Sequence, residues 1–340
     1  MTECLTTKKS NCKNCYKCIR KCPVKSIGFS DGQAYIIQED CVLCGECYTV
    51  CPQGAKIIRN EIDKARQLIG SKEKVYVSLA PSIYVYYKGK SLNKIKKAII
   101  KLGVDVVEET AIGATLVKQE YEKLIKEKKQ EIIISSCCHT VNTLIEKYYG
   151  QVVPYLANVI TPMHAHGKMI KEKDKDSKVI FIGPCISKKA EMDQYHGVDC
   201  VLTFDELDQW LKEENIEIED GEEDYLIEEG RARSFPIPGG IFACMDKEMD
   251  YEYIAIDGIE NCIEVLKDIS KGKIKNCFIE MSACSGSCVG GPIMKREDSN
   301  LIRDRLIIKE QVREKDFSVK RLEKNEIYHE FYYENNRQIM

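Results

Sequence analysis

Short apolar runs alternate with amphipathic segments over most of this chain. The runs are rich in β-branched residues and predict strands buried on both faces. They cover residues 75–80, 104–107, 131–134, 178–182 and 198–202. Because segments with helical spacing lie between them, the pattern predicts an α/β fold with largely parallel sheets.

Several of the intervening helices carry start signals. Ser91 precedes an apolar stripe with helical spacing that ends at Gly103, which predicts an N-cap and a C-terminal stop. Thr203 and Glu206 have the spacing of a capping box ahead of a helix that carries Trp210. Residues 60–70 predict a short amphipathic helix that connects the first sixty residues to the rest of the chain.

The first sixty residues are organised by cysteines, in two runs with CxxCxxCxxxCP spacing. In this arrangement the first three thiolates of a run bind one 4Fe-4S cube and the fourth crosses to the other cube. We therefore expect one cluster on Cys12, Cys15, Cys18 and Cys51, and the other on Cys41, Cys44, Cys47 and Cys22. The alternative, tetrahedral zinc, would need self-contained sets of four cysteines without this repeated proline pattern.

The pattern divides the chain into three regions. Residues 1–60 form a small two-cluster ferredoxin-like domain, residues 61–309 a larger α/β domain, and residues 310–340 a charged tail that we expect to be partly helical and to lead to a further C-terminal region. No apolar stretch reaches the length of a membrane span, and the N-terminus does not resemble a secretory signal, so we expect a cytoplasmic protein with no membrane contact. The clustered cysteines indicate reduced thiolates and an anaerobic host.

Charge is spread unevenly, although the net charge is only −3. Residues 1–60 hold nine Lys and Arg against five Asp and Glu, which suits an acidic electron-carrier protein as partner. The run from Glu213 to Glu229 holds ten acidic residues and no basic one, which is typical of a solvated loop or helix face. Nothing in the sequence suggests nucleic-acid binding.

Three further cysteine sites each follow an apolar run. They are SSCCH at 135–139, GPCISKKAE at 183–191 and EMSACSGSCVGGP at 280–292. A single cysteine is often only a small buried apolar residue. Together, however, these sites offer the four thiolates that a third 4Fe-4S cube needs, with one to spare.

These three sites resemble signatures of the iron-only ([FeFe]) hydrogenase family, and the resemblance extends from Cys12 to about residue 300. It implies a large two-lobed domain with mostly parallel sheets behind a small α+β ferredoxin-like domain. It also implies an H-cluster: a third 4Fe-4S cube on Cys138, Cys185, Cys284 and Cys288, with Cys288 bridging to a two-iron unit that bears carbonyl, cyanide and an azadithiolate. This unit would be absent without maturation proteins.

The resemblance also implies roles around the two-iron unit. Cys137 would exchange protons with its amine, Lys188 would bind one cyanide, and the backbone of Pro81 and Ser82 would meet the other. Ser282 stands in the cofactor pocket where the family has methionine. Cys137, Lys188 and Cys288 are thus the expected catalytic residues.

The sequence departs from the family at positions that matter for proton transfer. His139 and Val141 replace a proline and a tryptophan, and the family's GGGQP is shortened to GGP. In an ungapped register its outer proton route becomes Glu120, Ala157 and Lys123, of which only the first relays a proton in the usual way. His139 either titrates near the cluster and restores part of this route or is a helix-terminal histidine in contact with solvent.

The remaining candidates have structural explanations. We expect His164 and His166 to be structural or exposed, and Tyr84, Tyr86 and Tyr87 to pack beside the Ala80–Ser82 loop. Four cysteines outside every motif are expected in the core, namely Cys200, Cys244, Cys262 and Cys277.

The sequence therefore predicts a divergent hydrogenase of the sensory type, which interconverts dihydrogen with protons and electrons at low turnover. Its electrons would pass through the N-terminal clusters to a ferredoxin-like carrier or a signalling partner. One alternative is a non-catalytic hydrogenase-like iron–sulfur carrier or assembly protein that lacks the two-iron unit. Another is an electron-transfer adaptor in a larger complex.

Overall fold

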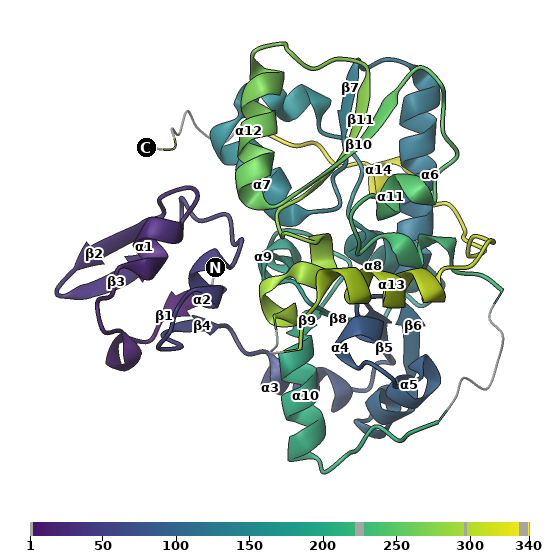
Figure 1. Cartoon of the computed structure of the whole chain (residues 1–340). Coiled ribbons are helices and arrows are strands. Elements are labelled where there is room, and N and C mark those ends of the chain that lie inside the picture. Colours follow the sequence, from purple (N-terminus) through teal and green to yellow (C-terminus); the bar gives the residue numbers. More distant parts are fainter. Residues whose placement is uncertain (1–2, 222–227, 296–297, 333–338, 340) are drawn as a thin grey trace.

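The structure of the protein is a computed structural model that describes residues 3–221, 228–295, 298–332 and 339. Residues 222–227 of the acidic run, and 333–338 and 340 of the tail, lie outside the described residues. The chain forms a small N-terminal domain beside a larger domain with two sheets, one above the other in the view of Figure 1.

The N-terminal domain is built from two antiparallel strand pairs and short helices. Strand β1 (Leu5–Thr7) pairs with β4 (Lys56–Ile58), and β2 (Ile27–Ser30) pairs with β3 (Gln33–Ile36). Helices α1 (Lys17–Lys21) and α2 (Glu46–Thr49) each begin within a cysteine run. The residue before each helix, Tyr16 or Gly45, has a left-handed backbone, which turns the chain sharply at the metal-binding loop.

The lower sheet of the large domain has four parallel strands in the order β6-β5-β8-β9. The strands are β5 (Val75–Leu79), β6 (Val106–Glu109), β8 (Lys178–Gly183) and β9 (Cys200–Thr203). They confirm four of the predicted strands, with β6 shifted by two residues. Helices α5 (Leu92–Lys101) and α10 (Phe204–Glu213) connect to it.

The upper sheet has three parallel strands in the order β10-β11-β7. They are β10 (Glu252–Asp257), β11 (Cys277–Ser282) and β7 (Ile132–Ile134), and helices α7 (His139–Tyr148) and α12 (Ile259–Ser270) pack against this sheet. Strands β10 and β11 were not among the predicted strands. Strand β10 is an edge strand with charged ends and several partly exposed side chains, so it lacks the continuous apolar run of a doubly buried strand.

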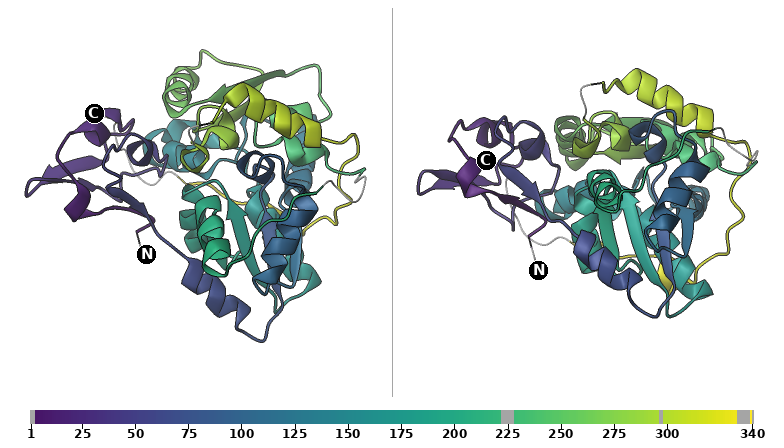
Figure 2. Two further views of the ribbon diagram at one scale, coloured as in Figure 1. Left: turned by 60° about the horizontal axis from the view of Figure 1, so that its bottom comes forward. Right: turned by 90° about the horizontal axis from the view of Figure 1, so that it is seen from below.

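Two long helices pack against each other and join the two lobes. Helix α6 (Ala111–Glu127) follows β6 and packs closely on α8 (Pro162–Lys173). A Cβ at Gly113 would lie 2.4 Å from the carbonyl oxygen of Pro162, so the close crossing requires glycine there. Figure 2 shows the two lobes and the N-terminal domain from two further directions.

The predicted helix starts are confirmed. The Ser91 hydroxyl accepts a hydrogen bond from the Lys94 backbone N–H, and Thr203 and Glu206 form a complete capping box. Helix α3 (Ile62–Ile69) connects the two domains as predicted. Its start is held because the backbone N–H of Glu61 donates to the Glu206 carboxylate at 2.7 Å.

The two domains share an interface next to the second cysteine run. The Tyr148 hydroxyl donates to the Asp40 carbonyl at 2.7 Å, and Leu5 and Val42 lie in one buried cluster with apolar residues of α7 and α12. A Cβ at Gly45 would lie 2.4 Å from Cγ of Pro292. The second cysteine run is therefore packed directly onto the loop that carries the last cysteine motif.

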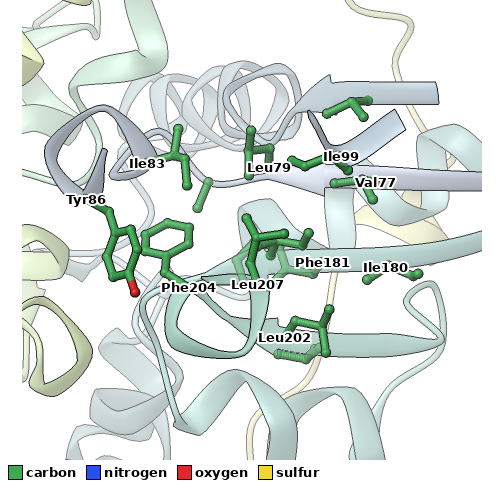
Figure 3. Packing of buried hydrophobic residues seen from close by; sticks show 14 of the residues in the cluster. Val77, Leu79, Ile83, Tyr86, Ile99, Ile180, Phe181, Leu202, Phe204 and Leu207 are labelled. Atoms are coloured by element: carbon green, nitrogen blue, oxygen red, sulfur yellow. The ribbon is translucent and has the colours of Figure 1, made fainter. Parts of the chain in front are cut away.

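The lower lobe contains the largest apolar core. Figure 3 shows residues of this core around Leu79 and Phe204. Tyr86 packs on Phe204 with ring centroids 5.0 Å apart, and its hydroxyl donates to Asp205. Tyr84 and Tyr86 are buried, which is the packing role predicted for them. The four cysteines outside every motif are buried as well.

The remaining helices are short, apart from one near the C-terminus. They are α4 (Ile83–Tyr86), α9 (Ser187–Gln194), α11 (Gly240–Ala243), α13 (Leu301–Gln311) and α14 (Lys324–Ile327), with 3-10 turns at Lys9–Asn11, Gly150–Tyr155, Arg231–Ser234, Ser287–Gly290 and Pro292–Met294. Of the helices in the described part of the chain, none is long and apolar enough to cross a bilayer.

The C-terminal segment is only partly helical. Helix α13 spans the predicted boundary at residue 310, and between Val312 and Tyr332 the one described helix is the short α14. This segment is anchored to the large domain, because Leu322 and Ile327 are buried in a cluster with α6.

A buried ion pair joins the lower sheet to the Arg231–Ser234 turn and yields the first prediction. Arg233 donates two hydrogen bonds of 2.7 Å to the Glu109 carboxylate, and both side chains are buried. Arg233→Ala leaves this carboxylate unpaired and should lower the free energy of unfolding by about 3–5 kcal/mol. Chemical denaturation measures the change.

The control for this prediction is an exposed pair. Lys212→Ala removes a surface contact with Asp208 and should cost less than about 1 kcal/mol. Equal destabilisation by the two variants would contradict the buried-pair argument.

Candidate iron–sulfur centre

The candidate site lies where the carboxyl ends of the two parallel sheets meet. The Ala80–Ser82 loop follows β5 and the Pro184–Cys185 loop follows β8, both from the lower sheet. The Ser135–Cys138 loop follows β7, and Ala283 and Cys284 follow β11, both from the upper sheet. Loops at the carboxyl ends of parallel strands are the usual place for ligands in open α/β sheets.

These loops enclose a cavity of about 100 Å³. Its reactive lining consists of the side chains of Cys137, Cys138, Cys185, Cys288 and Lys188, together with Pro81, Ser82 and Ser282. The remaining walls are mostly apolar and come from α6, α8 and the segment before α11. The structure thus brings every residue expected around the two-iron unit to a single pocket.

Cys284 lies beside this cavity. It lies near Cys138, Cys185 and Cys288, so the four expected ligands of the third cube are neighbours. The Cys288 side chain lies deep in the molecule, where it is exposed to the cavity and is not packed against other side chains. Among the described residues no three His, Cys, Asp or Glu side chains converge tightly enough to hold a single metal ion.

Burial decides the protonation of these thiols. It raises the pKa of Cys185 to about 11 and holds those of Cys284 and Cys288 well above their usual range. The thiols are therefore neutral until a metal displaces their protons. A 4Fe-4S cube suits this donor set because thiolate is its ordinary ligand.

One polar atom in the cavity lacks a partner. The Ser82 hydroxyl is buried and makes no hydrogen bond with the described residues. An unpaired buried hydroxyl normally costs free energy, so its place in the cavity lining favours a polar group within the pocket. The residues present therefore fit the cofactor that the sequence implies.

Lys188 is the one cationic side chain that lines this cavity within the described residues. Its ammonium donates to the Glu191 carboxylate and, at 3.3 Å, to the Cys137 carbonyl oxygen. Burial alone would lower the pKa of Lys188, but Glu191 outweighs it and the pKa is raised. The pKa of Glu191 falls to about 2 despite its burial, chiefly because of Lys188. Both groups are therefore charged at neutral pH.

The N-terminal cysteines gather in the crossed sets that the sequence predicts. A small cavity is lined by Cys12, Cys15, Cys18 and Cys51. The other four also gather, because Cys41, Cys22 and Cys47 all lie near Cys44. Cys44 lies near Cys284, and its neighbour Gly45 contacts Pro292, so the second set faces the expected third cube.

Sequence reasoning missed Tyr121, which contacts the Cys137 thiol. Its buried hydroxyl lies 3.2 Å from the Cys137 sulfur and 3.0 Å from the Ser136 hydroxyl. The ungapped register placed Glu120 in the proton route, but that carboxylate points elsewhere and accepts hydrogen bonds from Arg321 and Tyr328. A one-residue shift on a helix turns a side chain by about 100°.

The hydrogen bonds around Tyr121 have a defined direction. A carbonyl only accepts, so the Ser136 hydroxyl must donate to the Val159 oxygen at 2.5 Å. Tyr121 therefore donates to the Ser136 hydroxyl, and its oxygen receives the Ser136 backbone N–H and the Cys137 S–H. This chain starts at the Cys137 thiol and ends on a backbone carbonyl, which offers no path to solvent.

The other relay positions are also unfavourable. Ala157 is buried and has no exchangeable proton, and Lys123 is partly exposed rather than part of a buried relay. Burial raises the pKa of Cys137 to about 12, so the thiol is protonated at neutral pH.

His139 also differs from expectation, whereas His166 agrees with it. His139 is buried rather than in contact with solvent, and it contacts Ser187 and Gln194. Burial lowers its pKa, so it remains neutral near pH 7 and does not titrate there. His166 is structural as predicted, since it contacts Ser78 and Glu108.

Fold and site together define an iron–sulfur protein with a two-cluster domain ahead of a hydrogenase-like α/β domain. Residues 11–55 match the 4Fe-4S dicluster domain, and residues 73–292 match the family described as iron only hydrogenase large subunit, C-terminal domain. The second match covers more than half of the chain. The chain therefore belongs to the iron-only hydrogenase large-subunit family.

Its relatives include both hydrogenases and proteins with other names. Nuclear prelamin A recognition factor of Mus musculus is 22% identical, over 76% of this chain and 73% of that protein. Iron hydrogenase 1 of Clostridium pasteurianum is 25% identical, over 84% of this chain and 64% of that protein. Cytosolic iron-sulfur assembly component 3 of Mus musculus is 21% identical, over 78% and 73%.

A solved structure supports the fold. The [FeFe]-hydrogenase HydA1 from Chlamydomonas reinhardtii superposes with a TM-score of 0.60 at 18% identity, covering 77% of this chain and 91% of that one. At this identity the likeness concerns the fold alone.

Removal of one cavity thiol tests the third cube. Cys185→Ala should reduce bound iron from about twelve to about eight atoms per chain, because one cube of three loses a ligand. Iron analysis and electron paramagnetic resonance of the reduced protein measure this. Cys200→Ala, a buried cysteine outside every motif, should keep the full iron content, and a parallel loss there would contradict the assignment.

A conservative change tests the Tyr121 hydrogen bonds. Tyr121→Phe leaves the Ser136 backbone N–H without its acceptor and should lower the free energy of unfolding by about 1–3 kcal/mol. Tyr35→Phe, at an exposed position, should change it by less than about 0.5 kcal/mol. If urea denaturation gives the same small value for both, the proposed bonding is wrong.

Proposed function

We propose that this chain reacts slowly and reversibly with dihydrogen at an H-cluster and reports hydrogen or redox state to a partner. The observation that carries the proposal is the pocket in which Cys137, Lys188 and the unpaired Ser82 hydroxyl adjoin Cys288. A protein that held only a third cube would have no need of these three groups.

The residues would hold the cofactor from several sides. Cys138, Cys185, Cys284 and Cys288 would bind the cube, and Cys288 would also reach the two-iron unit. Lys188 offers an ammonium, and the Ala80–Ser82 loop offers backbone and hydroxyl groups. When bound, the two-iron unit supplies the metal chemistry that splits or forms dihydrogen, while the apolar walls exclude water from it.

Electrons have a short route through the chain. The second N-terminal cysteine set adjoins the third through Cys44 and Cys284, and the contact of Gly45 with Pro292 keeps these loops together. The basic surface of residues 1–60 suits an acidic carrier protein. A ferredoxin-like carrier or a signalling protein is the partner that we propose, with maturation proteins supplying the two-iron unit.

Proton transfer to the pocket would limit the rate of the reaction. Cys137 holds one at the pocket, but the hydrogen bonds behind it end on the Val159 carbonyl oxygen. A thiol that has given up its proton would regain it only after local rearrangement. Low turnover with intact ligand residues suits a sensor better than a bulk producer of hydrogen.

The second candidate is a non-catalytic iron–sulfur carrier or assembly protein. It is favoured by the name of the assembly component among the relatives, and equally by the closed hydrogen-bond chain behind Cys137. In this case the three cubes remain and the pocket stays without a two-iron unit. The relative's name also favours a cytosolic location.

Loading with a synthetic two-iron cofactor separates the two candidates. The first predicts infrared bands of metal-bound carbonyl and cyanide and slow hydrogen evolution with a reduced dye. Cys137→Ala should lower this rate by at least about tenfold, since positioned proton transfer contributes 10²–10⁴-fold in enzymes. Absence of the bands would contradict the first candidate and favour the second, and an unchanged rate in Cys137→Ala would exclude the thiol as proton donor.

A further inference from the structure

Four of the five histidines of the chain line one cavity on the far side of α9 from the cysteine pocket. This cavity, which we call the histidine cavity, has a volume of about 240 Å³ and is lined by His139, His164, His196 and His329 together with Asn142 and Glu191. It lies between α7, α8, α9 and the C-terminal segment that follows α14. None of its residues binds a cluster in the assignment above.

His164, which lines this cavity, has a ring nitrogen without a hydrogen-bond partner among the described residues. Its Nδ1 lies 3.2 Å from the His196 carbonyl oxygen, and because a carbonyl only accepts, Nδ1 carries the proton. Burial lowers the pKa of His164, so the ring is neutral and Nε2 keeps its lone pair. His164 is 2% exposed, and Nε2 has no hydrogen-bond partner among the described residues.

Asn142 presents a second unpaired acceptor. Its amide nitrogen donates to the Ser136 carbonyl at 2.8 Å, which settles the orientation of the side chain. Its Oδ1 is buried and has no partner within the described part of the chain. Two residues that line one cavity thus each carry a buried acceptor without a donor, which favours an occupant that supplies hydrogen-bond donors.

Glu191 adds charge to the same cavity. Its Oε1 accepts from the Thr161 hydroxyl at 2.6 Å and lies 3.8 Å from His164 Nε2, too far for a direct hydrogen bond. Among the charged lining groups, Lys168 is paired with Glu326, and Glu191 itself is paired with Lys188. The lining thus offers three acceptors, one of them a carboxylate, to an occupant with several hydrogen-bond donors.

We propose that the histidine cavity binds a small cation with several N–H donors, namely ammonium or a short primary amine. The N–H groups would donate to His164 Nε2, Glu191 Oε1 and Asn142 Oδ1. Glu191 also forms an ion pair with Lys188. An occupant that binds the Glu191 carboxylate would therefore weaken this ion pair and affect the Lys188 side chain in the cysteine pocket. This coupling rests on the proposed function of the cysteine pocket, whereas the binding itself does not.

The binding test uses the full chain with its 4Fe-4S clusters and without a two-iron unit. Ammonium chloride and methylammonium chloride are titrated by calorimetry, against tetramethylammonium chloride at equal ionic strength, because the last cation has no N–H donor. We expect saturable heat with the first two salts only. Equal binding heats from all three salts would overturn the proposal and leave water as the occupant. This result can be obtained with the parent protein alone.

Two histidine variants locate the site. His164→Asn keeps a donor at the place of Nδ1 and removes the Nε2 acceptor, so ammonium affinity should fall by about tenfold or more, as expected for a hydrogen bond to a charged group. His196→Gln changes an exposed side chain at the cavity mouth and should alter affinity less than twofold. Unchanged affinity in His164→Asn would refute the assignment.

The coupling to Lys188 has its own readout. The electron paramagnetic resonance spectrum of the reduced third cluster should change with ammonium in the parent protein and stay constant in His164→Asn. Binding without any spectral change would refute the coupling and leave the cation site standing. Failure of hydrogen chemistry after loading with the two-iron cofactor would affect neither result.

Discussion

The carboxyl ends of two parallel sheets face each other in this protein, and the position of every candidate functional group depends on that constraint. Parallel strands deliver their following loops to a common edge. Loops from the lower sheet supply Cys185 and Ser82, and loops from the upper sheet supply Cys138 and Cys284. No single element holds the centre, because the four expected ligands of the third cube come from three loops that are far apart in the sequence. The packing of α6 on α8, which joins the lobes, therefore helps to hold these loops in place.

A second constraint is the ion pair between Lys188 and Glu191. Both charges are buried, and each makes the other tolerable in a region from which water is largely excluded. Because α9 separates two cavities, this pair faces the cysteine pocket on one side and the histidine cavity on the other. Any change of charge near Glu191 therefore alters the electrostatic environment of Lys188. The pair gives the cysteine pocket a cation of defined position and links it to a region that the family signatures do not describe.

The candidate site combines the family's binding residues with a chain of hydrogen bonds that ends on a backbone carbonyl. The cysteines and Lys188 follow the family signatures, whereas the groups behind Cys137 do not. Tyr121 satisfies the thiol, the Ser136 backbone and the Ser136 hydroxyl at once, which stabilises the loop but directs its hydrogen bonds to a carbonyl. Stability of the loop and access for protons are therefore in conflict here. This conflict is compatible with a slow hydrogen-responsive protein and with an iron–sulfur protein that has no hydrogen chemistry at all.

Local spacing in the sequence was enough to predict the two N-terminal cysteine runs, the parallel strands of the lower sheet, the helix caps at Ser91 and Thr203 and the membership of the family. These features depend on contacts between residues close together in the chain or on repeated motifs. Tertiary structure alone decided that Tyr121 rather than Glu120 meets Cys137, because a helix face is selected by what packs against it. It also decided that His139 is buried and neutral, and that the C-terminal segment closes a cavity with His329. Protonation and hydrogen-bond direction are properties of an environment that distant segments build together, and no local pattern in the sequence encodes them.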